Sequence, residues 1–230
     1  MLSNKTKIVG LATFFLFIFC FVLDFVAALS SIDSISNAGS LQGELVFLLI
    51  FEVLISIVLI VNSSMGIHKL VKLEDRDAAF RRASDGVGAF GVYVAFAEFY
   101  AIHLASRIYK QYGAAYKVPA IFIVIIVLTI IAVIFAAIAS IKSLKLSPAA
   151  RSLLLAISSL MMVVVLIIII SQGQQKTLTV IEYVFLILAL FASISFAYCC
   201  YDDQKNKLNA PQDVAEPHIP TNNNDNQNQQ

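Results

Sequence analysis

Four ionisable side chains lie inside otherwise apolar runs of this sequence, namely Asp24, Glu52, Glu98 and His103. Carboxyl and imidazole groups in such surroundings can take up and release protons or bind a cation. In hydrocarbon, an ionised carboxylate costs at least about 2.5 kcal/mol, so each acid must face protein or water, pair with another group, or carry a proton. Lys and Arg residues lie only toward the ends of these runs, so they are not placed to neutralise three acids.

The surroundings of Glu98 indicate which way its side chain points. Gly91, Glu98 and Ala105 are spaced seven residues apart and therefore share one face of a helix. Small residues at this spacing let neighbouring helices approach closely, so we expect Glu98 to face protein and not lipid. His103 follows five residues later, about 140° around the helix, so it does not pair with Glu98 within that helix.

Two interpretations of these residues remain open at the level of sequence. In the first, Asp24, Glu52 and Glu98 form a path for protons or cations, with His103 as a relay. In the second, each acid is a neutral hydrogen-bonding group that holds helices together, as Glu52 could do with Ser56 one turn later.

The composition places these residues in a membrane protein. The chain has 230 residues, of which 59% are hydrophobic and 13% are charged, whereas soluble domains have about 25% charged residues. A soluble fold of this size could not bury so much apolar surface. The net charge of +1 also argues against a nucleic-acid partner, which would require a basic face.

The apolar runs are long enough for helices that cross a bilayer, which requires about 20 residues each. They predict an all-α, polytopic membrane protein whose domain covers residues 1–201 as a bundle of six transmembrane helices, arranged as three helical hairpins. The runs exceed the length of a strand and lack the alternation of a membrane barrel. The predicted spans are 8–28, 44–61, 87–107, 118–140, 152–171 and 181–200.

The first span has an alternative interpretation as a secretory signal peptide. Lys5 and Lys7 precede an apolar run, and Ser30 ends a stretch that suits cleavage. We favour a retained helix because the run is slightly long and Asp24 interrupts it just before that stretch.

The distribution of basic residues predicts the orientation. Twelve Lys and Arg residues fall on the side that holds both termini, and four fall on the other side. Both termini should therefore be cytoplasmic. The basic residues on the side of the termini are Lys5, Lys7, Lys69, Lys72, Arg76, Arg81, Arg82, Lys142, Lys145, Arg151, Lys205 and Lys207, and the others are Arg107, Lys110, Lys117 and Lys176.

Two segments on the predicted cytoplasmic side have distinct compositions. Residues 202–230 are rich in Asn, Gln and Asp, with too little apolar surface to order, and should form a disordered tail. The loop 69–82 should be partly helical, and Leu70, Leu73 and residues 78–80 could give it an apolar stripe against the inner membrane surface.

The sequence contains no HExxH, GxSxG or GxGD motif and no Gly-rich phosphate loop, so it predicts no enzyme, no cofactor and no metal site. Cys199 and Cys200 follow the last apolar run, where cysteines are candidates for palmitoylation or simply fill the end of a helix.

Taken together, these features predict a small transporter or channel-like protein for protons, cations or a small solute. The alternative is a non-transporting assembly factor or an accessory subunit of a membrane complex. The expected partners are the lipid bilayer and either further copies of the chain or other membrane proteins.

Overall fold

The structure, a computed structural model, describes residues 2–32, 35, 39–113, 115, 117–172 and 177–209. These residues form six long helices and one short 3-10 helix, which confirms the prediction of an all-α membrane bundle. All six long helices are sufficiently long and apolar to cross a membrane, so the chain is a multi-pass membrane protein. The elements are α1 (Asn4–Ser30), η1 (Gly39–Leu41), α3 (Gln42–Val71), α4 (Arg76–Gln111), α5 (Ala120–Ser140), α6 (Pro148–Ser171) and α7 (Thr177–Asn209).

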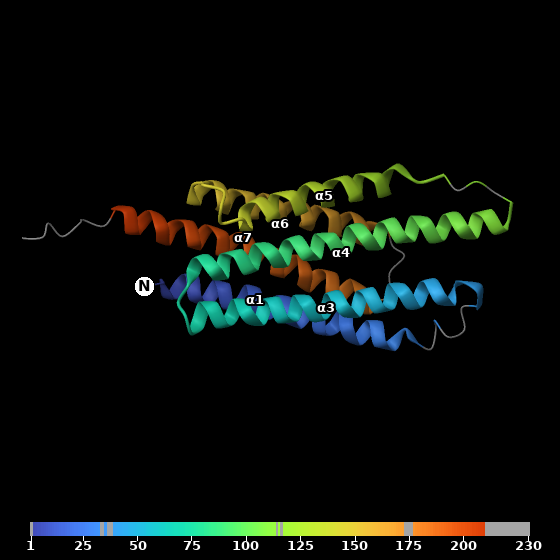
Figure 1. Ribbon diagram of the computed structural model, residues 1–230, viewed down its shortest axis with the longest axis horizontal. Helices are drawn as coiled ribbons and strands as arrows, with labels where there is room; N and C mark the ends of the chain where they lie inside the picture. The colour runs from blue at the N-terminus through green and yellow to red at the C-terminus, as the bar shows by residue number, and fades with distance from the viewer. Residues whose placement is uncertain are drawn as a thin grey trace, which may run out of the picture.

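The helices run up and down side by side and form a closed ring (Figure 1). Each helix packs against its neighbours in the sequence, and α7 closes the ring by packing against α1. The pairs α1/α3, α4/α5 and α6/α7 are antiparallel hairpins, as predicted. Helix α4 also contacts α1, α6 and α7 across the ring, so it touches all five other helices. Helix α4 is also the least apolar of the six spans.

Local sequence signals start three of these helices. The side chains of Ser3, Asp75 and Ser147 accept hydrogen bonds from backbone N–H groups in the first turns of α1, α4 and α6, respectively. Such caps satisfy N–H groups that have no partner within the helix. Pro148 follows at the first position of α6, where its missing N–H and fixed φ are favourable.

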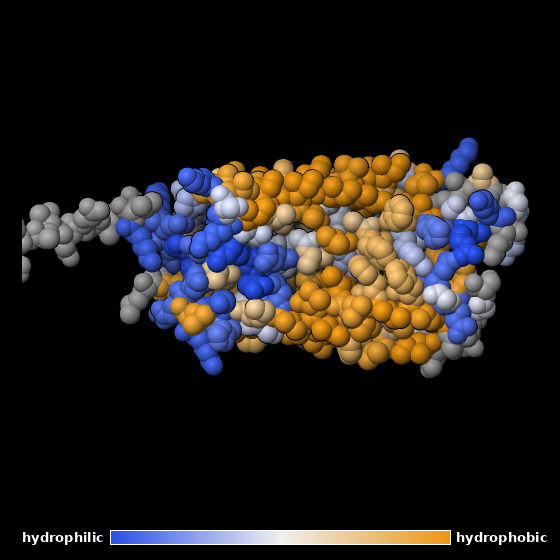
Figure 2. Space-filling view, in the orientation of Figure 1, coloured by the Kyte–Doolittle hydropathy of each residue, from blue (hydrophilic) through white to orange (hydrophobic). Residues whose placement is uncertain are grey.

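The outer surface of the bundle is apolar over its middle. Figure 2 shows a broad hydrophobic band between two hydrophilic ends. Large apolar side chains from all six helices are exposed in the band, among them Phe15, Leu54, Phe99, Ile134 and Leu160. Their exposure is consistent with a surface that faces the hydrocarbon of a bilayer.

Helices α3 and α4 are longer than the predicted spans. They contain 30 and 36 residues, or about 45 and 54 Å of helix, which exceeds the roughly 30 Å of a bilayer core. Most of the length beyond the predicted spans lies at one end of the bundle, where α3 continues to Val71 and α4 begins at Arg76. The loop 69–82 is helical apart from the turn at 72–75. This agrees with the prediction that the loop is partly helical.

The predicted apolar stripe on this loop is wrong. Leu70, Ala79 and Phe80 are buried in the bundle core, and Ala78 is 8% exposed. Only Leu73 is exposed. The extended ends of α3 and α4 pack against neighbouring helices, so these side chains are covered by protein and not by the membrane surface.

The predicted start of the tail at Asp202 is also too early. Helix α7 continues to Asn209, and its Asp203 carboxylate accepts a hydrogen bond from the Ser3 backbone N–H at 3.2 Å. This contact with α1 ties the extension of α7 to the bundle. Residues 210–230 of the predicted tail, like Lys176 in the charge count, lie outside the described residues.

The start of α1, the turn 72–75, the α5–α6 loop and the end of α7 lie together, and we call this the basic end (Figure 1). The Lys7 ammonium donates a hydrogen bond to the Glu74 carboxylate, with 2.6 Å between Nζ and Oε1. This hydrogen bond, together with the charge of Lys7, lowers the pKa of Glu74 below its ordinary value. The contact joins the start of α1 to the turn between α3 and α4.

We predict that the basic end is cytoplasmic, because Lys and Arg are retained on that side of a membrane. A reporter fused after Gln230 should be active in the cytoplasm, and one inserted at Gly113, in the turn after α4, should be active on the opposite side. Reporters active only on a given side of the membrane would measure this. Two reporters on the same side would contradict the topology, and a reversed pair would contradict the orientation.

Candidate functional site

Asp24 is the centre of a buried cluster of acids. Its side chain is 4% exposed and lies six residues before the end of α1, about 9 Å along the helix. The Ser56 hydroxyl of α3 is hydrogen-bonded to Asp24 Oδ2. The carboxyls of Glu52 on α3 and Glu182 on α7 lie next to the Asp24 carboxyl. Three helices therefore contribute to one site.

Contacts between these acids are favourable when the cluster carries protons. An ionised carboxylate only accepts hydrogen bonds, so two carboxyls can bond to each other only when one of them carries a proton. Asp24 has two such neighbours, so a proton on one of the three carboxyls lets it donate to another. Ser56 can serve either state of Asp24, because its Oγ also lies 2.9 Å from the Glu52 carbonyl oxygen. It can donate to that carbonyl while accepting from protonated Asp24, or donate to ionised Asp24.

A small cavity adjoins the cluster and brings in Glu98. The cavity measures about 50 Å³, and it is lined by Asp24, Glu98, Glu182 and the rings of Tyr93 and Tyr183, together with apolar side chains of α1, α4 and α6. A water needs about 10–15 Å³ by this kind of measure and two to four polar partners. The cavity therefore has the room and the polar groups for a few waters between Glu98 and the cluster.

Cations are paired elsewhere. Within the described residues, the ion pairs are Lys7–Glu74 and Arg76–Asp77 at the basic end, and Arg107–Glu44 near the opposite end. None of them includes a member of the cluster. In the same part of the chain, no group of three His, Cys, Asp or Glu side chains is arranged to hold a metal ion.

The structure brings together some of the predicted residues and separates others. Asp24 and Glu52 are in direct contact, and Glu98 reaches the same cavity from α4. His103 does not join them. Its ring is exposed and lies beside Tyr100, with centroids 6.0 Å apart, so a relay through His103 has no support from its position.

Glu182 is the site residue that sequence reasoning missed. It is the second residue of the predicted span 181–200, and an acid at the end of a span is ordinarily interpreted as a solvated residue. In the structure α7 begins at Thr177, five residues earlier, and the Glu182 side chain is only 6% exposed. A signal was available, because Asp24 and Glu182 both lie near the ends of their spans on the same predicted side. Two such acids can meet if their helices are neighbours.

Cys199 and Cys200 are each 4% exposed, so neither thiol is presented to solvent or lipid in this conformation. Palmitoylation of either one stays a prediction, and it would require the side chain to leave the bundle.

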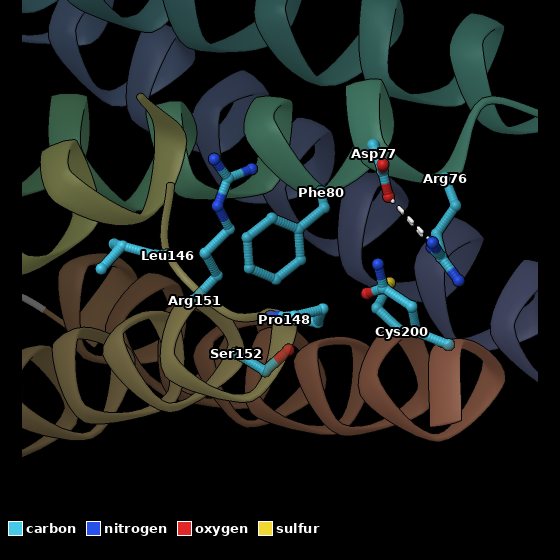
Figure 3. Close-up of a pocket in the computed structure, with 9 residues that line it drawn as sticks. Arg76, Asp77, Phe80, Leu146, Pro148, Arg151, Ser152 and Cys200 are labelled. Atoms are coloured by element: carbon cyan, nitrogen blue, oxygen red, sulfur yellow. Dashed lines mark hydrogen bonds and ion pairs between the residues drawn. The ribbon is translucent and has the colours of Figure 1, made fainter. Parts of the chain in front are cut away.

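Cys200 lines a second cavity, of about 80 Å³, at the basic end between α4, α6 and α7 (Figure 3). Arg76 faces Asp77 there, and one guanidinium nitrogen of Arg151 donates to the carbonyls of Ile141, Lys142 and Leu144. Both guanidinium groups are thus engaged by the protein, and Arg151 holds the loop between α5 and α6.

Comparisons with protein-family models, with curated proteins and with solved structures give no match. The interpretation of the site therefore comes from its own residues.

Proposed function

We propose that this protein moves protons across its membrane by way of the Asp24–Glu52–Glu182 cluster. The observation that carries the proposal is a set of three adjacent carboxyls in an otherwise apolar bundle, next to a small cavity that Glu98 also lines. Acids buried within membrane spans commonly form proton relays. Glu98, across the cavity, is the group that would exchange protons with the cluster through water.

The size of the cavity favours protons over larger cargo. Sites for small organic molecules occupy about 300–1,000 Å³, whereas this cavity measures about 50 Å³. Toward the basic end, the core is filled by fully buried side chains such as Phe17, Phe90 and Met162. A proton that enters the cluster would therefore leave toward the basic end only after these side chains rearrange.

The second candidate is an assembly factor or accessory subunit in which the acids only hold helices together. One observation favours it, which is that the six helices are continuous in the described residues. Transporter sites are often built on broken helices. Hydrogen bonds between polar side chains also stabilise helix pairs within membranes, and the Asp24 contacts with α3 and α7 would do so here.

Flux measurements on purified protein in liposomes separate these candidates. We predict that the wild-type chain dissipates an imposed pH gradient, and that Glu52→Gln and Glu98→Gln each lower the initial rate at least tenfold. Gln keeps the shape and most of the hydrogen bonding but cannot titrate. Asp85→Asn is the matched control, because Asp85 lies exposed on α4 away from the cavity.

The outcomes are distinct. If the wild-type protein leaves the gradient intact, the proposal of proton movement fails. If flux occurs but both Gln variants keep the wild-type rate, the acids are structural and the protons take another route. A parallel measurement with an imposed Na⁺ or K⁺ gradient tests whether a metal cation moves instead.

A further inference from the structure

A groove runs along the outside of the bundle between α6 and α7, close to the basic end. Its volume is about 260 Å³, and its lining is almost entirely apolar. Ala149, Ser152 and Ala156 from α6 form part of the lining, and Tyr198 and Tyr201 from α7 form another part. The three small residues recur at helical spacing on one face of α6, so this face leaves space beside α7 that larger side chains would fill.

The mouth of this groove carries positive charge. The Lys5 ammonium lies 5.9 Å from the centroid of the Tyr198 ring. Within the described residues, Lys5 forms no ion pair, so its N–H donors remain free for an anion. Lys205 is exposed one turn after Tyr201 on α7. Ala149 lies in the first turn of α6, at the positive end of the helix dipole.

We propose that this groove binds an anionic phospholipid, with one acyl chain along the small residues of α6 and the phosphodiester at Lys5. The apolar lining suits an acyl chain, and the cation at the mouth suits an anionic headgroup. Tyrosines at the boundary between hydrocarbon and headgroups are favourable because their rings are amphipathic. Asp202, half-buried on the same helix, repels an anion, so the headgroup must lie on the Lys5 side of the groove.

A helix from a second copy of the chain fits the groove less well than a lipid does. The basic mouth offers no benefit to an apolar helix, and a second copy would bring its own Lys5 and Lys205 to the same end of the membrane. The lipid satisfies both the apolar groove and the charge at its mouth.

Native mass spectrometry of the purified protein tests the proposal with phosphatidylglycerol and phosphatidylcholine of identical acyl chains. The wild-type protein should retain phosphatidylglycerol more tightly. Lys5→Gln should weaken its binding by about fivefold, the effect of one basic residue near a charged lipid, and leave phosphatidylcholine unchanged. Ala156→Phe should weaken both lipids by filling the groove. Leu160→Phe, on an exposed part of α6 outside the groove, is the control and should change neither.

Equal binding of the two lipids by the wild-type protein would overturn the proposal, as would an Ala156→Phe variant that binds phosphatidylglycerol like the control. A dimer that Ala156→Phe disrupts, without any preference between lipids, would show that a second copy occupies the groove, and it would also overturn the proposal. None of these outcomes depends on proton flux, so the groove and the acid cluster are tested separately.

Discussion

Asp24→Leu is expected to lower the free energy of unfolding by about 2–5 kcal/mol, because it leaves several buried polar groups without a partner. The Asp24 carboxyl is hydrogen-bonded to Ser56 and lies next to the carboxyls of Glu52 and Glu182, and Leu can bond none of these groups. Asp24→Asn should cost less than about 1 kcal/mol, since its amide can donate to a carboxylate while its oxygen accepts from Ser56.

Unfolding in detergent micelles by added SDS, followed by circular dichroism, would measure both variants. Asp85→Leu is the control for added hydrophobicity at an exposed position and should shift stability by no more than about 0.5 kcal/mol. If Asp24→Leu is as stable as Asp24→Asn, the carboxyls do not bond one another and the cluster is wrong.

Asp24→Asn also separates the two roles of the cluster. If the variant folds but its proton flux is at least tenfold below that of the wild type, proton transfer depends on the titration of Asp24 and not only on its hydrogen bonding. A folded variant with wild-type flux would leave Asp24 a structural group.

The helices of this protein could be predicted from sequence because each one must bury its backbone hydrogen bonds and expose apolar side chains to lipid. Runs such as 118–140 meet that condition along their whole length, and α5 occupies Ala120–Ser140. The same reasoning identified Asp24 and Glu52, because an acid is costly in any apolar run.

The partners of these acids could not be predicted, because the apolar pattern does not specify which helices are neighbours. The contact of α7 with α1 brings Glu182 to Asp24 across about 160 residues of chain. The burial of the joined ends of α3 and α4 could not be predicted for a related reason. Leu70 and Phe80 read as a surface stripe when taken alone, yet they are buried because the two helices continue beyond the membrane core and pack there.

The second large effect is expected where α1 crosses α3. Gly66 has no side chain, and a Cβ at this position would lie 2.4 Å from the Phe14 ring atoms Cε1 and Cζ. Phe14 is 1% exposed and packs edge-on against Phe196, with ring centroids 6.1 Å apart, so it has little room to move. Gly66→Ala should therefore lower the free energy of unfolding by about 1–3 kcal/mol through overpacking.

Gly88→Ala is the matched control for this substitution. A Cβ at Gly88 would lie 3.5 Å from the Ala136 Cβ, which is an ordinary contact. Both substitutions gain the same helix propensity, about 0.5–1 kcal/mol, so Gly88→Ala should stabilise the protein while Gly66→Ala destabilises it. The SDS titration used for Asp24 would measure the two opposite signs.

Truncation of Phe14 should recover part of the loss. In the double variant Gly66→Ala/Phe14→Leu, the smaller Leu side chain leaves space for the new methyl group. The double variant should therefore be more stable than the sum of the two single changes, by about 0.5–3 kcal/mol of coupling. Additive single changes, or a Gly66→Ala variant as stable as Gly88→Ala, would show that α1 and α3 do not approach closely at Gly66. Because Asp24 and Ser56 lie farther along the same two helices, that result would also remove the support for their contact.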